Sequence, residues 1–205
     1  MVRNNMVIGV DFDNTITNYD ELMHELASKQ GWIKTQIRAN KQEIRDHIRS
    51  LDNGEIKWQE LQAMVYGEFM YQAKLIDGVQ DFFSSCYKEE IPIFIVSHKT
   101  QFAAQDKDKI DMHKAALSWL NEKRFFKKEH VFFEPTRQKK IERIEKLGCT
   151  HFIDDLLETF LEAAFPKDVQ KILYAPHGAE KLNQDILVKH SWEEIYDSFF
   201  TNIRK

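Results

Sequence analysis

Glycine, proline and cysteine are scarce in this chain of 205 residues, which contains 7, 4 and 2 of them respectively. The scarcity of glycine and proline excludes a collagen-like or low-complexity chain and favours regular helices and strands. Cys86 and Cys149 fit neither a zinc motif nor a redox motif by their spacing. We therefore expect two reduced thiols with no role in metal binding.

Long hydrophobic runs and a large net charge are also missing. No stretch approaches the roughly 20 apolar residues of a membrane span. The apolar piece at residues 6–10 is too short for a signal-peptide core and runs directly into carboxylates. The formal net charge of -4 provides no basic stripe for a nucleic-acid backbone. We expect a cytoplasmic protein that binds neither membrane nor nucleic acid, and the sequence leaves its oligomeric state open.

Five short apolar runs have the continuous hydrophobicity of buried parallel strands. They cover residues 6–10, 91–97, 131–134, 151–154 and 171–175. Other segments space their apolar residues three and four apart, as amphipathic helices do. These segments cover residues 78–90, 108–122, 139–148, 155–165 and 192–200. Alternation of this kind predicts an α/β fold with a Rossmann-like, five-stranded parallel sheet flanked by helices.

The alternation is interrupted between residues 18 and 74, where no strand is expected. Helical patterns occupy this interval instead, over residues 19–30, 33–51 and 57–75. The interval is much longer than the few residues of an ordinary βα loop. We predict a small, all-α subdomain over 18–74, inserted into an α/β core formed by 1–17 and 75–205.

Polar residues follow three of the apolar runs directly. Asp11 and Asp13 follow the first run, Ser97 ends the second, and Asp154 ends the fourth with Asp155 directly after it. In an open parallel sheet, ligands bind outside the carboxyl ends of the strands, where the strand order reverses. If the first strand lies between the second and the fourth, these side chains meet at one edge of the sheet.

Carboxylates that converge in this way repel one another and require a cation. Mg²⁺ binds few protein carboxylates, keeps several waters and bridges readily to a phosphate oxygen. A lysine that opens the helix before the fourth strand would neutralise a transferring phosphoryl group. The apolar spacing of that helix favours Lys140 over Lys139, because Lys140 begins its buried stripe. Carboxylate, metal, hydroxyl and ammonium together indicate phosphoryl transfer, in which an aspartate can be the nucleophile.

The stretch DFDNT, residues 11–15, resembles the DxDxT signature of the haloacid dehalogenase-like (HAD) superfamily of phosphohydrolases. Ser97 after a strand, a lysine opening a helix, and Asp154-Asp155 after another strand resemble its other three motifs, in the same order. The insertion after the first motif is similar to the helical cap of that family. The resemblance spans nearly the whole chain and implies a Mg²⁺-dependent phosphatase.

The resemblance also implies a role for each motif residue. Asp11 would attack phosphorus, and Asp13 would protonate the leaving oxygen and then activate water. The Asp11 carboxylate, the Asp13 main-chain carbonyl and Asp155 would hold Mg²⁺. Asp154 would be a further ligand or an orienting residue, and Asp155 is favoured as the direct ligand. The presence of Asp13 favours phosphate chemistry over dehalogenation.

The remaining predicted site residues would contact substrate or support the motifs. By the same resemblance, Thr15 would brace Asp13, Ser97 would bind a phosphoryl oxygen, and Lys140 would be catalytic. His98 and Lys99 follow Ser97 directly and are placed to contact a substrate phosphate or hydroxyl, although a solvated loop pair fits the sequence equally well.

The expected substrate is a small phosphorylated metabolite, either a sugar phosphate or a nucleoside monophosphate, and the cap residues that select it are left open. Three alternatives remain. They are a catalytically inactive HAD-like scaffold, a phosphomutase, and a receiver-type phospho-accepting domain. The last is disfavoured because its lysine follows the last strand, whereas here the lysine precedes the fourth.

Overall fold

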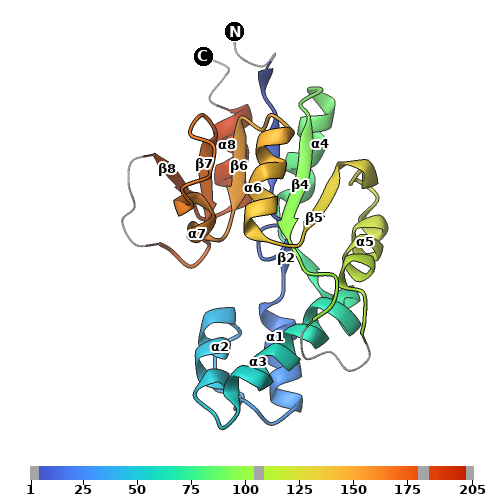
Figure 1. The fold of residues 1–205 in the computed structure, drawn as a ribbon, viewed down its shortest axis with the longest axis vertical. Coiled ribbons are helices and arrows are strands. Elements are labelled where there is room, and N and C mark those ends of the chain that lie inside the picture. The colour runs from blue at the N-terminus through green and yellow to red at the C-terminus, as the bar shows by residue number, and fades with distance from the viewer. Residues whose placement is uncertain (1–4, 104–108, 180–184, 202–205) are drawn as a thin grey trace. The chain divides into compact units, whose positions relative to one another are not determined.

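The computed structural model describes residues 5–103, 109–179 and 185–201 (Figure 1). The described residues form two compact units. The first contains residues from Met1–Ile16, Leu75–His98 and Phe125–Lys205, and the second contains residues from Thr17–Lys74 and Lys99–Arg124. Among the described residues, no helix is long and apolar enough to cross a membrane.

The first unit is built on a six-stranded sheet whose neighbouring strands are all parallel. Its spatial order is β5 (Val131–Glu134), β4 (Ile93–His98), β1 (Ile8–Val10), β6 (His151–Asp154), β7 (Gln170–Tyr174) and β8 (Ile186–Lys189). All three residues of β1 are buried because strands lie on both sides of it. The predicted α/β class and parallel sheet are confirmed.

The predicted number of five strands was wrong, because β8 pairs with β7 as a sixth strand at the edge of the sheet. Only three apolar residues, 186–188, lie between Asp185 and Lys189. Leu187 is 43% exposed, since an edge strand has a neighbour on one side only. The apolar run of β8 has the same length as that of β5 at the opposite edge, residues 131–133, so run length alone does not distinguish the missed strand from the predicted one.

Helices cover both faces of this sheet. Figure 1 shows α6 (Arg137–Lys146) in front of the strands, and α4 (Val79–Lys88) and α8 (Trp192–Phe200) behind them. On the rear face, the ring of Phe82 packs edge-on against Trp192 and Phe199, with centroids 5.2 Å apart in both pairs. The fourth helix, α7 (Leu157–Leu161), is shorter than the predicted 155–165.

The second unit is helical, as its sequence pattern predicts. It contains α1 (Asp20–Lys29), α2 (Lys41–Arg49), α3 (Gly54–Ala63), a π-helical turn (Met64–Glu68), a 3₁₀ turn (Met70–Gln72) and α5 (Met112–Lys123). The helix predicted over 33–51 begins only at residue 41, because the Asn40 side chain caps it by accepting hydrogen bonds from the Gln42 and Glu43 amides. Two short strands, β2 (Thr17–Asn18) and β3 (Lys74–Leu75), pair at the ends of the inserted segment, so the expectation of no strand over 18–74 was wrong at its two ends.

Residues 99–124 pack with the inserted helices, although the predicted core of 75–205 includes them. The Trp119 indole N–H of α5 donates to the Ala73 carbonyl at 2.8 Å, and this tryptophan is 1% exposed. The helix itself begins after Asp111, whose carboxylate accepts the Lys114 amide at 2.9 Å. Asp108, the first residue of the helix predicted over 108–122, lies outside the described residues.

Both cysteines are buried and free, and burial raises the pKa of each thiol to about 12. Thiolate, the reactive form, is therefore almost absent at pH 8. We expect iodoacetamide to label Cys86 and Cys149 at least about a hundredfold more slowly in the native protein than in urea. Mass spectrometry of timed samples measures this ratio, and rapid labelling of either cysteine without denaturant would contradict it.

Candidate active site

The candidate site lies at the carboxyl ends of three adjacent strands. The sheet places β1 between β4 and β6, which is the arrangement that the sequence analysis required for its polar residues to meet. Asp11 follows β1 directly, Ser97 and His98 end β4, and Asp154 ends β6. The Asp11 amide donates to the Ile153 carbonyl at 2.8 Å, which extends the β1–β6 pairing to the first aspartate.

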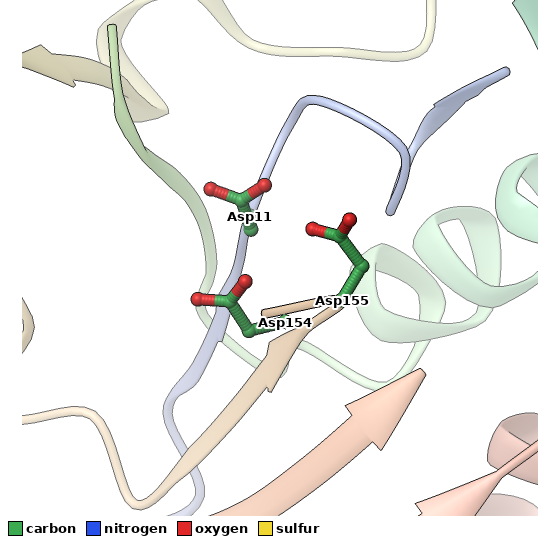
Figure 2. Close-up of side chains that lie close together, drawn as sticks. All are labelled: Asp11, Asp154 and Asp155. Carbon is green, nitrogen blue, oxygen red and sulfur yellow. The ribbon is translucent and has the colours of Figure 1, made fainter. Parts of the chain in front are cut away.

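Asp11, Asp154 and Asp155 form a carboxylate cluster at these strand ends (Figure 2). Each contributes a carboxylate oxygen, and these oxygens lie within 4.8 Å of one another. Asp11 is 4% exposed and Asp154 is fully buried, whereas Asp155 is partly exposed. Burial of several negative charges this close together is unfavourable unless a cation balances them.

Lys140 supplies one positive charge to the cluster. Its ammonium donates to Asp11 Oδ1 and to Asp154 Oδ2, both at 2.6 Å, and the side chain is 2% exposed. The Thr136 hydroxyl starts α6 by accepting the Lys139 amide at 3.1 Å, and this cap fixes which residues of the first turn face the sheet. Lys139 points elsewhere and pairs with Glu142 on the exposed surface.

The balance of charges shifts the pKa values of these groups. Burial raises the pKa of Asp11 to about 6; Lys140 opposes this shift, and the charges of Asp154 and Asp13 add to it. Burial alone would lower the pKa of Lys140, but the charges of Asp11 and Asp154 outweigh it and raise that pKa. Lys140 is therefore a permanent cation, and the cluster retains an excess of negative charge.

The loop that follows Asp11 links the two halves of the cluster. Asn14 adopts a left-handed backbone conformation with φ of 61°, which an asparagine tolerates better than most residues. The turn brings the Thr15 hydroxyl to Asp155, where it accepts the main-chain amide at 3.1 Å and donates to Oδ1 at 3.4 Å. These bonds hold Asp155, and the predicted bracing of Asp13 by Thr15 stays a prediction.

The other predicted site residues have different surroundings. Asp13 is partly buried, and its carboxylate is not part of the close cluster among the described residues; its predicted contribution of a main-chain carbonyl stays a prediction. Ser97 is 1% exposed at the end of β4. His98 is exposed beside it; partial loss of solvent around the imidazole lowers its pKa, and the charge of Lys140 lowers it further.

Lys99 belongs to the second unit. Its side chain is 4% exposed, and its ammonium lies 4.7 Å from the centroid of the Tyr66 ring. The main-chain carbonyl of Lys99 bonds to His113 Nε2 at 2.7 Å, which ties the start of this segment to α5. A contact with substrate stays a prediction for this residue.

Trp192 also contacts the site, although it is not among the residues predicted from the sequence. Its indole N–H donates to the Thr15 carbonyl at 2.8 Å, across a separation of 177 residues. A tryptophan that begins an amphipathic helix is an ordinary core residue by its pattern, so no signal in the sequence pointed to this contact.

The donor set fits a hard divalent cation. Carboxylate oxygens are the ligands that Mg²⁺ takes in proteins, and oxygens bound to one such ion lie at most about 4.2 Å apart. The three carboxylate oxygens lie within 4.8 Å of one another, so side-chain rotations could bring them onto one ion. Asp11, Asp154 and Asp155 are the residues that could hold it.

No family model matches the sequence, and no curated protein is similar to it in sequence. Solved structures are similar to it over most of its length. A HAD-superfamily hydrolase of subfamily IA, variant 1, from Geobacter sulfurreducens is 13% identical, with a TM-score of 0.59 and coverage of 94% of this chain and 95% of its own. A HAD family hydrolase from Deinococcus radiodurans with bound phosphate and sodium is 10% identical, with a TM-score of 0.53 and 96% coverage of both chains.

A third similar structure is described as a dehalogenase; it is 9% identical, with a TM-score of 0.53, and the match covers 97% of this chain and 98% of that one. At these identities the comparisons establish the fold. The chain therefore has the fold of the HAD-superfamily hydrolases, and the resemblance inferred from its motifs is confirmed at that level.

Proposed function

We propose that this protein is a Mg²⁺-dependent, HAD-like phosphatase that hydrolyses a small phosphorylated metabolite through an aspartyl-phosphate on Asp11. The observation that carries the proposal is the buried contact of Lys140 with Asp11 and Asp154, beside Asp155, at the strand ends. A buried lysine held between two aspartates serves stability poorly, since apolar residues fill such a space as well or better. Placed at the ligand-binding edge of a parallel sheet, the arrangement supports a functional role.

The metal would be held by Asp11, by the Asp13 carbonyl and by Asp155. Both oxygens of Asp154 already have donors, since Oδ1 accepts the Leu156 amide at 3.0 Å and Oδ2 accepts Lys140. This supports Asp155 as the direct ligand and Asp154 as the residue that orients Lys140. When bound, Mg²⁺ supplies positive charge that balances the carboxylates and the phosphate oxygens.

The reaction would proceed in two displacements at phosphorus. In the first, an Asp11 carboxylate oxygen forms a bond to phosphorus while the bond to the ester oxygen breaks, and Asp13 donates a proton to that oxygen. In the second, water attacks the same phosphorus, Asp13 takes its proton, and the bond to Asp11 breaks to release phosphate. Lys140 keeps Asp11 ionised and in place, and Ser97 would donate to a phosphoryl oxygen.

We propose that the second unit acts as the cap and selects small substrates. Its first segment begins at residue 17, just after the Thr15 loop, and its second begins at Lys99, just after His98. In the sequence, both segments therefore start next to candidate site residues. A cap excludes water and large substrates from a catalytic site. Sugar phosphates and nucleoside monophosphates are the proposed substrates, with His98 and Lys99 as contacts, and the cytoplasm is the proposed location.

One of the similar structures is described as a dehalogenase, so the fold by itself is compatible with dehalogenation. The presence of Asp13 in DFDNT supports phosphate transfer, because it offers the acid and base that an ester requires. An inactive scaffold is the other alternative, and the retention of all four aspartates argues against it.

Steady-state hydrolysis of p-nitrophenyl phosphate tests the proposal, together with a panel of phosphorylated metabolites. Turnover that requires Mg²⁺ and is abolished by EDTA supports it, and release of inorganic phosphate separates a phosphatase from a phosphomutase. No metal-dependent turnover on any ester of the panel would refute the enzyme and favour the scaffold. Fluoride or chloride release from haloacids, without phosphatase activity, would favour the dehalogenase.

Asp13→Asn should trap the phosphorylated enzyme. Because p-nitrophenolate leaves without protonation, the first displacement should survive, whereas loss of the general base should slow the second by about 10²–10⁴-fold. Intact-mass spectrometry after an acid quench should show one added phosphoryl group. The Asp11→Asn protein is the control and should acquire none; turnover near the wild-type rate in Asp13→Asn would contradict the role.

A further inference from the structure

We infer that Trp192 is a positioning residue for the metal site, because its indole N–H holds the Thr15 loop and that loop holds Asp155. The inference rests on the proposed function, since it concerns the affinity of the same site for its divalent cation. It extends the site to a residue in the last helix that none of the four motifs contains.

The chain of contacts is short and buried. The Trp192 indole N–H donates to the Thr15 carbonyl at 2.8 Å, and the two side chains are 1% and 0% exposed. The Thr15 hydroxyl then accepts the Asp155 amide and donates to its carboxylate. One residue therefore separates Trp192 from a proposed metal ligand.

The Thr15 loop needs an external donor. It is a tight turn in which Asn14 is left-handed and the Ile16 amide donates to the Phe12 carbonyl at 3.0 Å. Leaving a buried carbonyl without a donor costs about 1–3 kcal/mol of folding stability. The indole N–H therefore satisfies the Thr15 carbonyl and holds the turn in its position relative to α8. Without the indole, the turn can relax and move the Thr15 hydroxyl away from Asp155.

Trp192 is itself rigidly held, as a positioning residue must be. Ser191 caps α8 by accepting the Glu194 amide at 3.1 Å, which fixes the helix start that carries Trp192. The ring packs against Phe82, with centroids 5.2 Å apart. Gly78 approaches so closely that a Cβ at this position would lie 2.9 Å from Trp192 Cβ. These contacts restrict movement of the indole, so its N–H stays in position to donate to the Thr15 carbonyl.

Trp192→Phe is expected to weaken Mg²⁺ binding by about tenfold, the lower part of the range for loss of a group that orients a metal ligand. Isothermal titration calorimetry of the purified protein measures the affinity directly, without reference to turnover. Phenylalanine keeps most of the ring packing and removes the N–H donor.

Trp119→Phe is the matched control. Trp119 is also 1% exposed and also donates its indole N–H to a main-chain carbonyl at 2.8 Å, but that carbonyl belongs to Ala73 in the second unit. The control should lose a comparable amount of stability in urea and keep the wild-type Mg²⁺ affinity. Equal affinity in wild type and Trp192→Phe would overturn the inference, as would equal weakening in both variants.

A double-mutant cycle tests the route through Thr15. Thr15→Val removes the hydroxyl that holds Asp155, so adding Trp192→Phe to this variant should weaken Mg²⁺ binding no further. Full additivity would show that Trp192 acts by another route and would overturn the inference. If the wild-type protein itself binds no Mg²⁺, the proposed function fails, and this outcome is distinct from wild-type binding that Trp192→Phe leaves unchanged.

A measurement on the wild-type protein covers the case in which Trp192→Phe does not fold. Coupling between two sites is reciprocal, so Mg²⁺ should slow hydrogen exchange of the Trp192 indole N–H. The chain has only 4 tryptophans, so their indole signals can be resolved by NMR of ¹⁵N-labelled protein. The Trp119 indole should exchange at the same rate with and without Mg²⁺. Unchanged exchange at Trp192 with saturating Mg²⁺ would overturn the inference.

Discussion

Asp11→Asn should abolish turnover while the protein stays folded. The amide keeps the shape of the carboxylate but lacks the nucleophilic oxygen, so we expect kcat to fall by at least about 10⁴-fold, as for removal of other nucleophiles. The fold should tolerate the change, because the cluster carries an excess of negative charge and Lys140 keeps its contact with Asp154. Phosphate release measures the first effect, and urea denaturation the second.

Asp168→Asn is the control for this substitution. Asp168 is an exposed aspartate of the same unit, so its conversion should change neither kcat nor stability. Turnover near wild type in Asp11→Asn would mean that another residue attacks phosphorus. Complete unfolding of Asp11→Asn would mean that the fold requires the Asp11 carboxylate, contrary to the expectation from the excess negative charge of the cluster.

The parallel sheet was predictable because its central strands are buried on both faces. Strand β6, next to β1, has the predicted bounds 151–154, and so does β5, 131–134, although β5 is an edge strand whose residues are only partly buried. The edge strand β8 was missed, although β5 at the opposite edge is equally short and was predicted. The helix predicted over 33–51 was too long because apolar spacing continued through residues 33–40, where Asn40 starts the helix by a side-chain bond that spacing does not reveal.

Assignment of residues 99–124 depended on tertiary contacts. Their sequence has the spacing of a helix between two core strands, which in an α/β fold predicts a helix packed on the sheet. In the structure this helix packs with the inserted segment, through Trp119 and Ala73 among others. The apolar face of a helix shows that it is buried but leaves open which surface buries it.

At the site, the residues that end strands and begin helices were predictable from the sequence. The apolar spacing of α6 predicted that Lys140 lies on the buried side, and the structure brings its ammonium to Asp11 and Asp154. The Thr15–Asp155 and Trp192–Thr15 bonds join residues 140 and 177 positions apart. No local pattern encodes such pairs, because they depend on how the Asn14 turn and α8 are placed in three dimensions.

The largest combined effect on stability and activity is expected for Lys140→Met. The substitution fills a similar volume but leaves Asp11 and Asp154 buried without their cation. Removing one partner of a buried ion pair typically costs about 3–5 kcal/mol, because the remaining charge is uncompensated. Urea denaturation without divalent cations should show this loss of unfolding free energy, and phosphatase activity should fall to background because the phosphoryl group loses a stabilising charge.

Lys139→Met is the neighbouring control, since its ammonium is exposed and, within the described part of the chain, pairs with Glu142 on the surface. It should change the unfolding free energy by less than about 0.5 kcal/mol and leave turnover unchanged. Mg²⁺ should raise the melting temperature of Lys140→Met more than that of wild type, because a site with one positive charge fewer gains more from binding a cation. A Lys140→Met protein as stable as wild type without Mg²⁺ would show that the acidic cluster does not depend on this lysine, and the proposed charge balance of the site would be wrong.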